Sequence, residues 1–372
     1  MGFGEASLLR VLMVHPHLDV YGGAERVIVE LASYMERKNV EYLVLTLSAH
    51  PEIKEKINLK TPEGKTYKYK VKTGFLDLVK LLDELSALRR LVKEHVGGFD
   101  VVNVHNFPAT WSAYPKVKPC LWMCNEVPSV SYVSNPSVSL RLANSVGTRI
   151  DKFIVRKAVD LICTSSEAMA LEVEEKYGVK PVILNYGVDY DFFSLGNGRE
   201  ASNMFDLHGK FVLLHSGWIT QQKNQMESVK ALKKIVSKIP NVKLVFSGSG
   251  SGRYEREVKK AVRDGKLEAY VVFTGHLDRE KLRSLYHACD LVLAPYGRQG
   301  GWLTPYEALC AGKPVIVSPE TAAASVIRRE GIGLVSSDLP KAVMEVYGNY
   351  ERYKLMAEKG KRFVAENLRW EN

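Results

Sequence analysis

The sequence predicts an α/β protein with two doubly wound domains, each built on a parallel β-sheet and together facing a ligand-binding cleft. Short, almost entirely apolar segments alternate with segments of helical periodicity, which is typical of parallel strands covered by helices on both faces. This alternation runs twice along the chain. The length of 372 residues exceeds one core of about 100–200 residues and suits two. We therefore expect domains 1–187 and 188–372, with ligands beyond the carboxyl ends of the strands.

In the first half, apolar residues recur at helical spacing after a glycine-containing loop, as at Val27, Ile28, Leu31, Tyr34 and Met35. The predicted strands are 9–15, 42–47, 100–104, 119–123, 161–164 and 182–184. The predicted helices are 24–37, 76–93 and 141–158.

The second half repeats the pattern. Its predicted strands are 211–215, 243–246, 270–274, 291–294, 314–317 and 333–335. Its predicted helices include 225–238, 254–262, 279–288 and 305–311. Thr304 is expected to cap the last of these helices, with Pro305 in its first turn.

The composition is that of a globular protein, because 46% of the residues are hydrophobic and 25% are charged. Apolar stretches are too short for a membrane-spanning helix, and residues 1–7 lack the pattern of a secretory signal. The number of cysteines is odd, which favours free thiols and a reducing compartment. The five are Cys120, Cys124, Cys163, Cys289 and Cys310. We expect a cytoplasmic protein.

The formal net charge is +10, and part of the excess of basic residues is concentrated in segment 60–93. Segment 60–93 holds nine basic and four acidic residues, and its second part has apolar residues at helical spacing. Such a basic amphipathic segment can lie on an anionic membrane surface, and it can equally be a core-facing helix beside a solvated basic loop. A nucleic-acid role would rest on charge alone, so we expect no nucleic-acid partner.

Glycine-rich loops follow several predicted strands. Gly22 and Gly23 open a helix, where backbone N–H groups can meet a phosphate. Segment 248–252 is an ordinary tight turn or a phosphate cradle. Segment 299–314 puts glycines before a helix that carries Glu307, which could accept hydrogen bonds from two ribose hydroxyls or could simply be an exposed side chain.

Two motifs resemble metal sites without completing one. Asp189 and Asp191 are paired carboxylates at the domain boundary, and we interpret them as a turn and a helix cap. His15 and His17 have no evident third ligand, so we expect no metal and no cofactor beyond a co-substrate.

Taken together, the ordered motifs resemble the retaining, family-four glycosyltransferases (glycosyl transferases group 1), whose GT-B fold has two Rossmann-like domains. The resemblance covers nearly the whole chain. Its motifs are HPHLDVYGGAERVIVE at 15–30, VVNVHNFPA at 101–109, ILNYGVDYDFF at 183–193, HSGWITQQKNQ at 215–225 and QGGWLTPYEALCAGKPVIVS at 299–318.

The resemblance implies a role for each matching residue. Lys223 would contact the diphosphate of the donor, Glu307 the ribose, and His105 would lie beside the donor sugar; these three are the expected catalytic residues. The other expected donor-binding residues are Gly22, Gly23, Trp218, Gly248, Gln299, Gly300, Gly301, Leu303 and Thr304. The expected acceptor-binding residues are Asn106, Asn125 and Glu126.

The sequence departs from the family pattern at three positions. Trp218 replaces an arginine, Gln299 replaces the first of two paired glutamates, and Trp302 stands where a glycine is usual. A neutral amide and an indole cannot neutralise phosphate charge. The family's final helix, which crosses back to the first domain, is expected to be short or absent.

The resemblance implies an enzyme of glycan biosynthesis. It would move a hexose from a UDP- or GDP-linked sugar to a glycan or lipid-linked acceptor without a metal, at the cytoplasmic face of a membrane. Two alternatives remain: a nucleotide-sugar-binding protein with impaired catalysis, and a nucleotide-sugar epimerase of the same fold.

Overall fold

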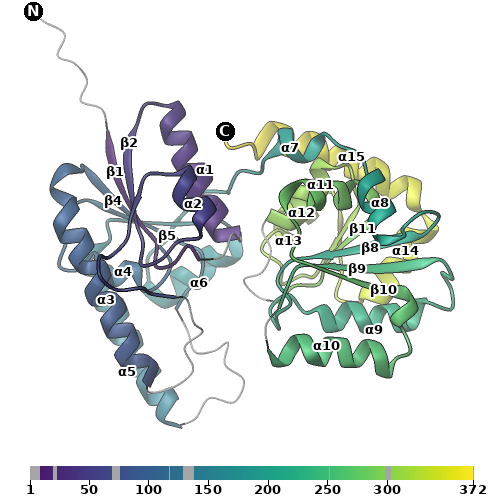
Figure 1. Cartoon of the computed structure of the whole chain (residues 1–372), viewed down its shortest axis with the longest axis horizontal. Helices are drawn as coiled ribbons and strands as arrows, with labels where there is room; N and C mark the ends of the chain where they lie inside the picture. Colours follow the sequence, from purple (N-terminus) through teal and green to yellow (C-terminus); the bar gives the residue numbers. More distant parts are fainter. Residues whose placement is uncertain are drawn as a thin grey trace, which may run out of the picture. The chain divides into compact units, whose positions relative to one another are not determined.

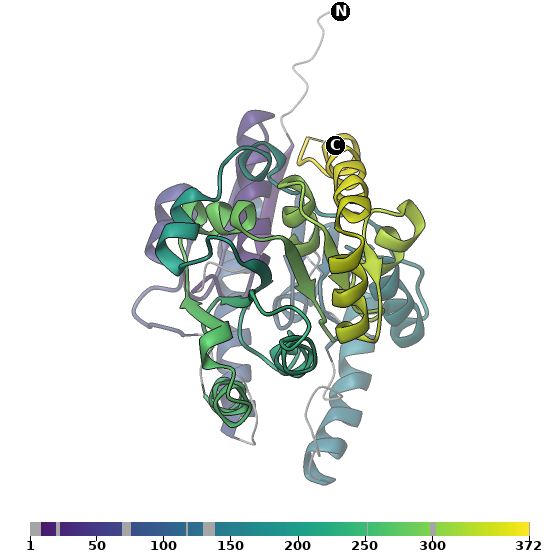
Figure 2. The ribbon, with the colours of Figure 1, turned by 90° about the vertical axis from the view of Figure 1, so that its right-hand side faces the viewer.

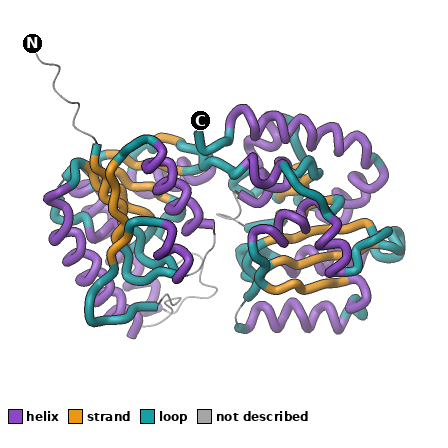
Figure 3. The backbone as a smooth tube through the Cα atoms, turned by 45° about the horizontal axis from the view of Figure 1, so that its top comes forward, coloured by secondary structure: helices purple, strands orange, loops and turns teal. Residues whose placement is uncertain are grey.

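The computed structural model describes residues 9–19, 23–68, 76–116, 118–128, 138–250, 252–297 and 303–371. The chain divides into two compact units, Met1–Asn185 and Tyr186–Asn372. Each unit contains one parallel sheet with helices on both of its faces (Figures 1 and 3). The predicted doubly wound α/β architecture is therefore confirmed in both halves of the chain.

The sheet of the first unit has the strand order β3-β2-β1-β4-β5-β6-β7 among the described residues. Its strands are β1 (Arg10–Val14), β2 (Glu41–Leu45), β3 (Leu59–Lys60), β4 (Val101–His105), β5 (Cys120–Cys124), β6 (Leu161–Thr164) and β7 (Val182–Ile183). Its helices are α1 (Gly23–Arg37), α2 (Pro51–Lys56), α3 (Leu76–His95), α4 (Ala109–Ser112), α5 (Val138–Ala158) and α6 (Glu167–Tyr177). The strand order reverses between β1 and β4, where open α/β sheets leave a crevice for ligands.

The sheet of the second unit has the order β10-β9-β8-β11-β12-β13 among the described residues. Its strands are β8 (Phe211–Ser216), β9 (Val242–Ser247), β10 (Val271–Gly275), β11 (Leu291–Ala294), β12 (Val315–Val317) and β13 (Leu334–Val335). Its helices are α7 (Tyr190–Ser194), α8 (Arg199–Phe205), α9 (Gln225–Ile235), α10 (Arg253–Asp264), α11 (Arg279–Ala288), α12 (Leu303–Cys310), α13 (Ala324–Glu330), α14 (Leu339–Gly348) and α15 (Tyr350–Asn367). Here the order reverses between β8 and β11.

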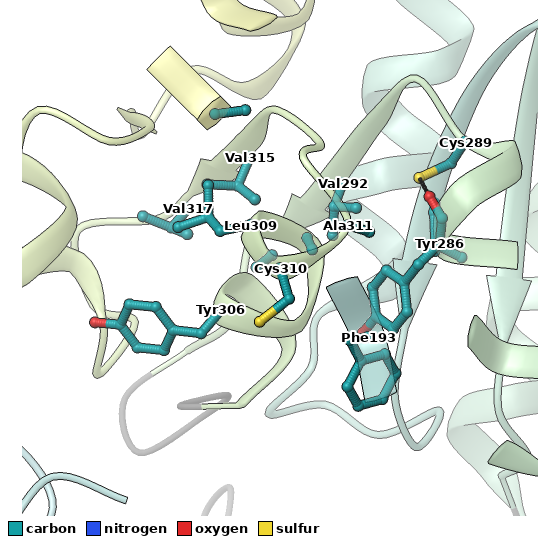
Figure 4. Packing of buried hydrophobic residues seen from close by; sticks show 14 of the residues in the cluster. Phe193, Tyr286, Cys289, Val292, Tyr306, Leu309, Cys310, Ala311, Val315 and Val317 are labelled. Atoms are coloured by element: carbon teal, nitrogen blue, oxygen red, sulfur yellow. Dashed lines mark hydrogen bonds between the residues drawn. The ribbon is translucent and has the colours of Figure 1, made fainter. Parts of the chain in front are cut away.

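Both faces of each sheet are buried, and this explains why the strands are almost entirely apolar. In β8, Val212 and Leu214 face one apolar cluster, whereas Phe211 and Leu213 face the other. Successive side chains of a strand point to opposite faces, so a strand buried on both faces needs an apolar residue at every position. Figure 4 shows the first of these clusters, in which α12 packs between strands and helices of the second unit.

Two helices of the second unit differ from what the sequence predicted: α12 begins earlier, and α15 was not predicted. Helix α12 begins at Leu303, so Thr304 lies inside its first turn and the prediction that Thr304 is the N-cap was wrong. Helix α15 packs on α12 within the second unit, where a Cβ added at Gly360 would come within 2.6 Å of Leu309. The sequence pattern did not single out α15, because its apolar residues form a narrow stripe along a highly charged helix.

Candidate active site

The loops after β8 and β9 pack against each other through glycines. Both Gly217 and Gly248 have φ of 134°, and a Cβ at Gly248 would lie 2.2 Å from the carbonyl oxygen of Gly217. The backbone N–H of Gly217 donates to Ser247 O (2.8 Å), which joins the two strand ends. This close approach requires glycine at residue 248 and places both loops beyond the carboxyl edge of the sheet.

The side chain of Gln225 holds the loop after β8 in shape. Its Nε2 donates to the carbonyl oxygen of Trp218 (2.8 Å), and its Oε1 accepts from the N–H of Thr220 (3.3 Å). Gln225 itself is completely buried. The Trp218 side chain remains 44% exposed, so it is available to contact a ligand rather than the core.

Lys223 carries a partly buried ammonium group at this site. Its side chain runs past Gly217, where an added Cβ would be 3.4 Å from Lys223 Cε. Its Nζ lies 4.0 Å from the ring centroid of Tyr296, a cation–π arrangement. Burial lowers the pKa of Lys223 to about 8, although the charge of Glu307 acts in the opposite direction. A cation that has lost much of its hydration is well suited to bind an anion.

Tyr296 and Thr304 connect this cation to the start of α12. The Tyr296 hydroxyl donates to Ser216 O (2.6 Å), and the Thr304 side chain is hydrogen-bonded to Tyr296. The first turn of α12 therefore lies near Lys223. Because the first backbone N–H groups of a helix lack partners within the helix, Leu303 and Thr304 can present such groups to an anion.

Glu307 is buried rather than exposed, with an accessible fraction of 4%. Its carboxylate accepts a hydrogen bond from the Tyr286 hydroxyl (2.8 Å), and it interacts with the charge of Lys223. Of the two alternatives that the sequence left open for Glu307, the exposed helix residue is therefore excluded. Tyr286 packs edge-on against Phe193, with ring centroids 5.5 Å apart, which orients its hydroxyl (Figure 4).

In the first unit, the ends of β1, β4 and β5 carry a chain of polar side chains. Asn106 Nδ2 is hydrogen-bonded to His15 Nε2 (3.1 Å), and Asn125 Nδ2 donates to Asn106 Oδ1 (3.0 Å). Asn106 has a positive φ of 59°, which turns the chain sharply after β4. The structure thus brings together Asn106 and Asn125, two of the expected acceptor residues. Glu126 follows them and is exposed.

His105 lies at the end of β4 and is almost completely buried. Its Nε2 is hydrogen-bonded to Asn103 Oδ1, and burial lowers its pKa to about 3. His105 is therefore neutral near pH 7. A neutral imidazole can donate or accept a hydrogen bond, but it does not supply positive charge.

Several expected site residues fall outside the described residues. These are Gly22, Gln299, Gly300 and Gly301. Gly23 is described and forms the exposed first residue of α1.

Three residues of the site were not predicted from the sequence, namely Tyr286, Tyr296 and Gln225. Tyr296 follows a predicted strand, a position that could have signalled it. Tyr286 lies in the last turn of α11, where the sequence offers no signal for a site.

Asp189 is a helix cap, as predicted. Its carboxylate accepts from the N–H of Phe192 (3.2 Å) and pairs with Arg279. Asp191 pairs with Arg369 instead.

Within the described ranges, no group of three or more His, Cys, Asp or Glu side chains could hold a metal ion. All five cysteines are free and buried.

Segment 60–93 divides into two parts. The second half of α3 places Leu88, Leu91 and Val92 in the core, whereas Val79 and Leu82 are exposed. In the preceding loop Lys65 pairs with Asp83 (2.6 Å). The helices of the described chain include none that is long and apolar enough to span a membrane.

Comparison with known proteins agrees with the two-unit architecture. The family model for glycosyl transferases group 1 matches residues 201–363, and the model for glycosyltransferase family 4 matches residues 21–192. The phosphatidyl-myo-inositol mannosyltransferase of Mycobacterium tuberculosis is 26% identical over 343 residues, covering 89% of this chain and 84% of that protein.

Solved structures show the same fold. HepE of Anabaena, in complex with UDP-glucose, superposes with a TM-score of 0.79 at 17% identity, covering 97% of this chain and 96% of HepE. WaaG, a glycosyltransferase involved in lipopolysaccharide biosynthesis, superposes with a TM-score of 0.75 at 18% identity, covering 95% of each chain. The matched models lie on the two α/β units that the structure shows, and the chain belongs to the family-four glycosyltransferases of the GT-B fold.

Proposed function

We propose that this protein is a retaining hexosyltransferase that uses a nucleotide-diphosphate sugar, with a UDP- or GDP-linked hexose as donor. The observation that carries the proposal is the group formed by Lys223, Tyr296 and Glu307 beyond β8 and β11. It combines one desolvated cation, the first turn of a helix and one buried carboxylate. A nucleotide sugar presents the complementary groups, namely two phosphates and a ribose diol.

In the proposed reaction, the bond between the sugar anomeric carbon and the phosphate oxygen breaks, and the leaving diphosphate takes the electron pair. The acceptor hydroxyl attacks from the same face and loses its proton to the leaving phosphate. Negative charge grows on the diphosphate, so its stabilisation requires preorganised positive charge. Lys223 and the N–H groups of Leu303 and Thr304 would supply it, and the proposal therefore needs no metal.

The remaining roles follow the same chemistry. Glu307, oriented by Tyr286, would accept hydrogen bonds from the ribose hydroxyls. Gly248 would let the backbone approach the phosphates, and Trp218 would stack on the donor. Gln299, Gly300 and Gly301 would lie beside the donor sugar, Gly22 and Gly23 beside its phosphates, and His105 near its reacting carbon.

We propose a glycan or lipid-linked acceptor, bound through Asn106, Asn125 and Glu126 in the first unit. The five free thiols favour a reducing compartment, in keeping with a cytoplasmic reaction. The mannosyltransferase relative is named for a phosphatidyl-inositol substrate, which supports a lipid acceptor. The exposed Val79 and Leu82 of segment 60–93 would then contact an anionic membrane surface.

A screen of nucleotide sugars tests the proposed function. A true donor at about 100 times its Kd should stabilise the folded chain by about 2.7 kcal/mol in thermal unfolding. Slow hydrolysis of that donor, followed by NMR, should release the sugar with its anomeric configuration retained. Absence of stabilisation by every nucleotide sugar would contradict the proposal.

The exposed Trp218, where the family has an arginine, favours one second candidate: a nucleotide-sugar-binding protein with impaired catalysis. In that case the screen would show binding without hydrolysis or transfer. Trp218→Arg separates the two functions, because it should create activity in an impaired protein and lower the donor selectivity of an active one. An epimerase would instead convert its nucleotide sugar without an acceptor, which product analysis detects.

A further inference from the structure

His215 is a buried polar side chain in an otherwise apolar part of β8. The four residues before it, 211–214, are apolar and buried, and His215 itself is 0% exposed. Burying an imidazole costs free energy unless its ring nitrogens are hydrogen-bonded. The contacts of the two ring nitrogens therefore decide what this histidine does.

One ring nitrogen of His215 is satisfied and the other is not. Nδ1 is hydrogen-bonded to Ser228 Oγ (2.8 Å), a buried hydroxyl on α9. Nε2 is buried and makes no full hydrogen bond within the part of the chain that the structure describes. The backbone of Lys223 nevertheless acts on the ring as a hydrogen-bond acceptor, at a geometry weaker than a full hydrogen bond. Because Ser228 occupies Nδ1, Nε2 is the atom that can donate to that acceptor.

The ring of His215 also packs against the residue that holds the Lys223 ammonium. The ring centroids of His215 and Tyr296 are 5.6 Å apart, and the rings are tilted by 49°. Lys223 Nζ lies 4.0 Å from the centroid of the same tyrosine. Burial, and the charge of Lys223, lower the pKa of His215 to about 3, so the imidazole is neutral near pH 7. A neutral ring adds no charge repulsion to the cation beside it.

His215 joins rigid elements to the turn that carries Lys223. It lies in β8, and its partner Ser228 lies in α9, which packs on the sheet and is seen end-on in Figure 2. The turn at 220–224 follows β8, and within it the N–H of Lys223 donates to Thr220 O (3.0 Å). Side chains anchored on strands and helices position a site more precisely than loops do. His215 is thus placed to fix where the turn holds its lysine.

We propose that His215 is a positioning residue for Lys223. Ser228 Oγ–H donates to Nδ1, which leaves the proton of the neutral imidazole on Nε2. Nε2–H is then directed at the backbone of Lys223 and holds the turn, so that the ammonium stays over Tyr296. Hydrogen bonds of this kind are often long in an unliganded site and shorten when substrate binds. The positioning role rests on the proposed function in one respect, the contact between Lys223 and the diphosphate.

The alternative role is that of a histidine that only fills space in the core. In that case the size of the ring and the bond to Ser228 matter, and Nε2 does not. Three substitutions separate the two roles, because an amide can replace one ring nitrogen at a time. His215→Gln keeps a donor near the position of Nε2, His215→Asn keeps a polar atom near the position of Nδ1, and His215→Phe keeps only a ring.

Steady-state kinetics with the true donor test the positioning role. His215→Phe and His215→Asn should lower kcat about 10- to 100-fold, because displacing a catalytic group by about 1 Å has effects of that size. His215→Gln should recover most of this loss, since it restores the donor toward Lys223. A space-filling histidine predicts instead that His215→Phe, which preserves the ring, is the most active of the three variants.

The pKa of Lys223 gives a second readout that needs no donor. NMR of isotope-labelled lysine side chains measures it, and Lys223→Met identifies the signal. In wild type this pKa is about 8, because the ammonium is buried. In His215→Phe and His215→Asn the side chain should leave Tyr296 and regain water, so its pKa should rise toward the ordinary 10.5. In His215→Gln it should stay near 8.

The groups around the ammonium are the same in all of these variants. Glu307 and Tyr296 face Lys223, and Tyr286 binds Glu307. None of them is substituted, so a change in the pKa of Lys223 reports on the position of its side chain.

Val262→Ala is the matched control for loss of stability. Val262 is buried in the same unit, but it lies in the last turn of α10, at the sheet edge opposite to Lys223. Removing its methyl groups destabilises the core. The variant should nevertheless change neither kcat nor the pKa of Lys223. Thermal unfolding verifies that each variant is folded, and if His215→Phe does not fold, the comparison of His215→Gln with His215→Asn decides.

Three outcomes would overturn the positioning role. One is a pKa of Lys223 that is equal in wild type and His215→Asn. Another is a kcat of His215→Asn that equals or exceeds that of His215→Gln. The last is an equal fall of kcat in Val262→Ala and His215→Phe. If the wild type binds no nucleotide sugar, the proposed function fails, whereas the NMR comparison still decides whether His215 positions Lys223.

Discussion

The ammonium group of Lys223 lies over the ring of Tyr296, 4.0 Å from its centroid, while the Tyr296 hydroxyl is bound to the carbonyl oxygen of Ser216. The cation is thus held by a ring that is itself held by the end of β8. Lys223→Ala removes this preorganised charge and should lower turnover of the true donor about 100-fold or more. Steady-state kinetics measure the effect. Lys230→Ala, an exposed lysine of α9, serves as the control, and near-wild-type turnover in Lys223→Ala would show that Lys223 is misassigned.

Donor binding should depend on pH through the same residue. Because burial lowers the pKa of Lys223 to about 8, the ammonium form is complete below that pH and is lost above it. Donor affinity should therefore be constant below pH 8 and fall as the pH rises above it, by up to about tenfold per unit. Calorimetric titrations across this range measure the fall. In Lys223→Met the same titrations should be flat, and an equal slope in both proteins would contradict the assignment.

Lys223 should also make the stability of the folded chain depend on pH. Stability should rise over the pH range in which donor affinity falls. Between pH 8 and the ordinary lysine pKa of 10.5, the folded state binds fewer protons at residue 223 than the unfolded state does. Stability then rises with pH through this window, because the buried ammonium no longer has to be desolvated. The difference in unfolding free energy between wild type and Lys223→Met, measured by urea denaturation, should shift in favour of wild type as the pH increases. A difference that is independent of pH would show that the ammonium is solvated.

Glu307 and Tyr286 should act as a pair in nucleotide binding. Glu307→Ala should weaken nucleotide affinity in calorimetry, because the proposed ribose contacts disappear. Tyr286→Phe leaves the carboxylate but removes a buried hydrogen bond, so it should cost about 1–3 kcal/mol of stability and weaken nucleotide affinity less than Glu307→Ala does. An unchanged Kd in Glu307→Ala would count against the ribose role.

The glycine contact between two loops should be sensitive to a single methyl group. Gly248→Ala places a Cβ 2.2 Å from Gly217 O at a φ of 134°, so the loops must separate, at a cost of about 3 kcal/mol. Gly209→Ala is the matched control, because Gly209 has a φ of 68° but no atom within 4 Å of the added Cβ. It should cost only about 1 kcal/mol. Equal losses in chemical denaturation would mean that the loop contact is unimportant.

Asp151 should be a strong determinant of stability in the first unit. Its buried carboxylate accepts from Trp111 Nε1 (2.8 Å) and from the Tyr177 hydroxyl (2.6 Å), and it pairs with Lys176. Asp151→Asn leaves the Lys176 charge without its partner carboxylate and should lower the unfolding free energy by about 3–5 kcal/mol. Asp264→Asn breaks an exposed pair with Lys260 and should change it by less than about 1 kcal/mol. Similar effects from both variants would contradict this ranking.

The sequence alone determined the architecture, because both sheets are covered on two faces and their strands are therefore almost entirely apolar. The periodicity of segments such as 24–37 and 279–288 predicted helices that the structure contains, as α1 and α11. Asp189 as a helix cap could also be predicted, since capping depends on neighbours a few residues away. The resemblance to family motifs identified Lys223 and Glu307 and implied a role for each. It did not indicate which groups surround them.

The tertiary structure decided which groups surround those residues. Tyr286, Tyr296 and Gln225 come from separate parts of the second unit, and long-range packing alone brings the two tyrosines to Glu307 and Lys223. The same packing buries Glu307 and lowers the pKa of Lys223, properties that depend on desolvation and not on local sequence. It also decides which apolar residues of α5 are buried: Ile154 and Val155 face the core, whereas Phe153 in the same turn remains exposed.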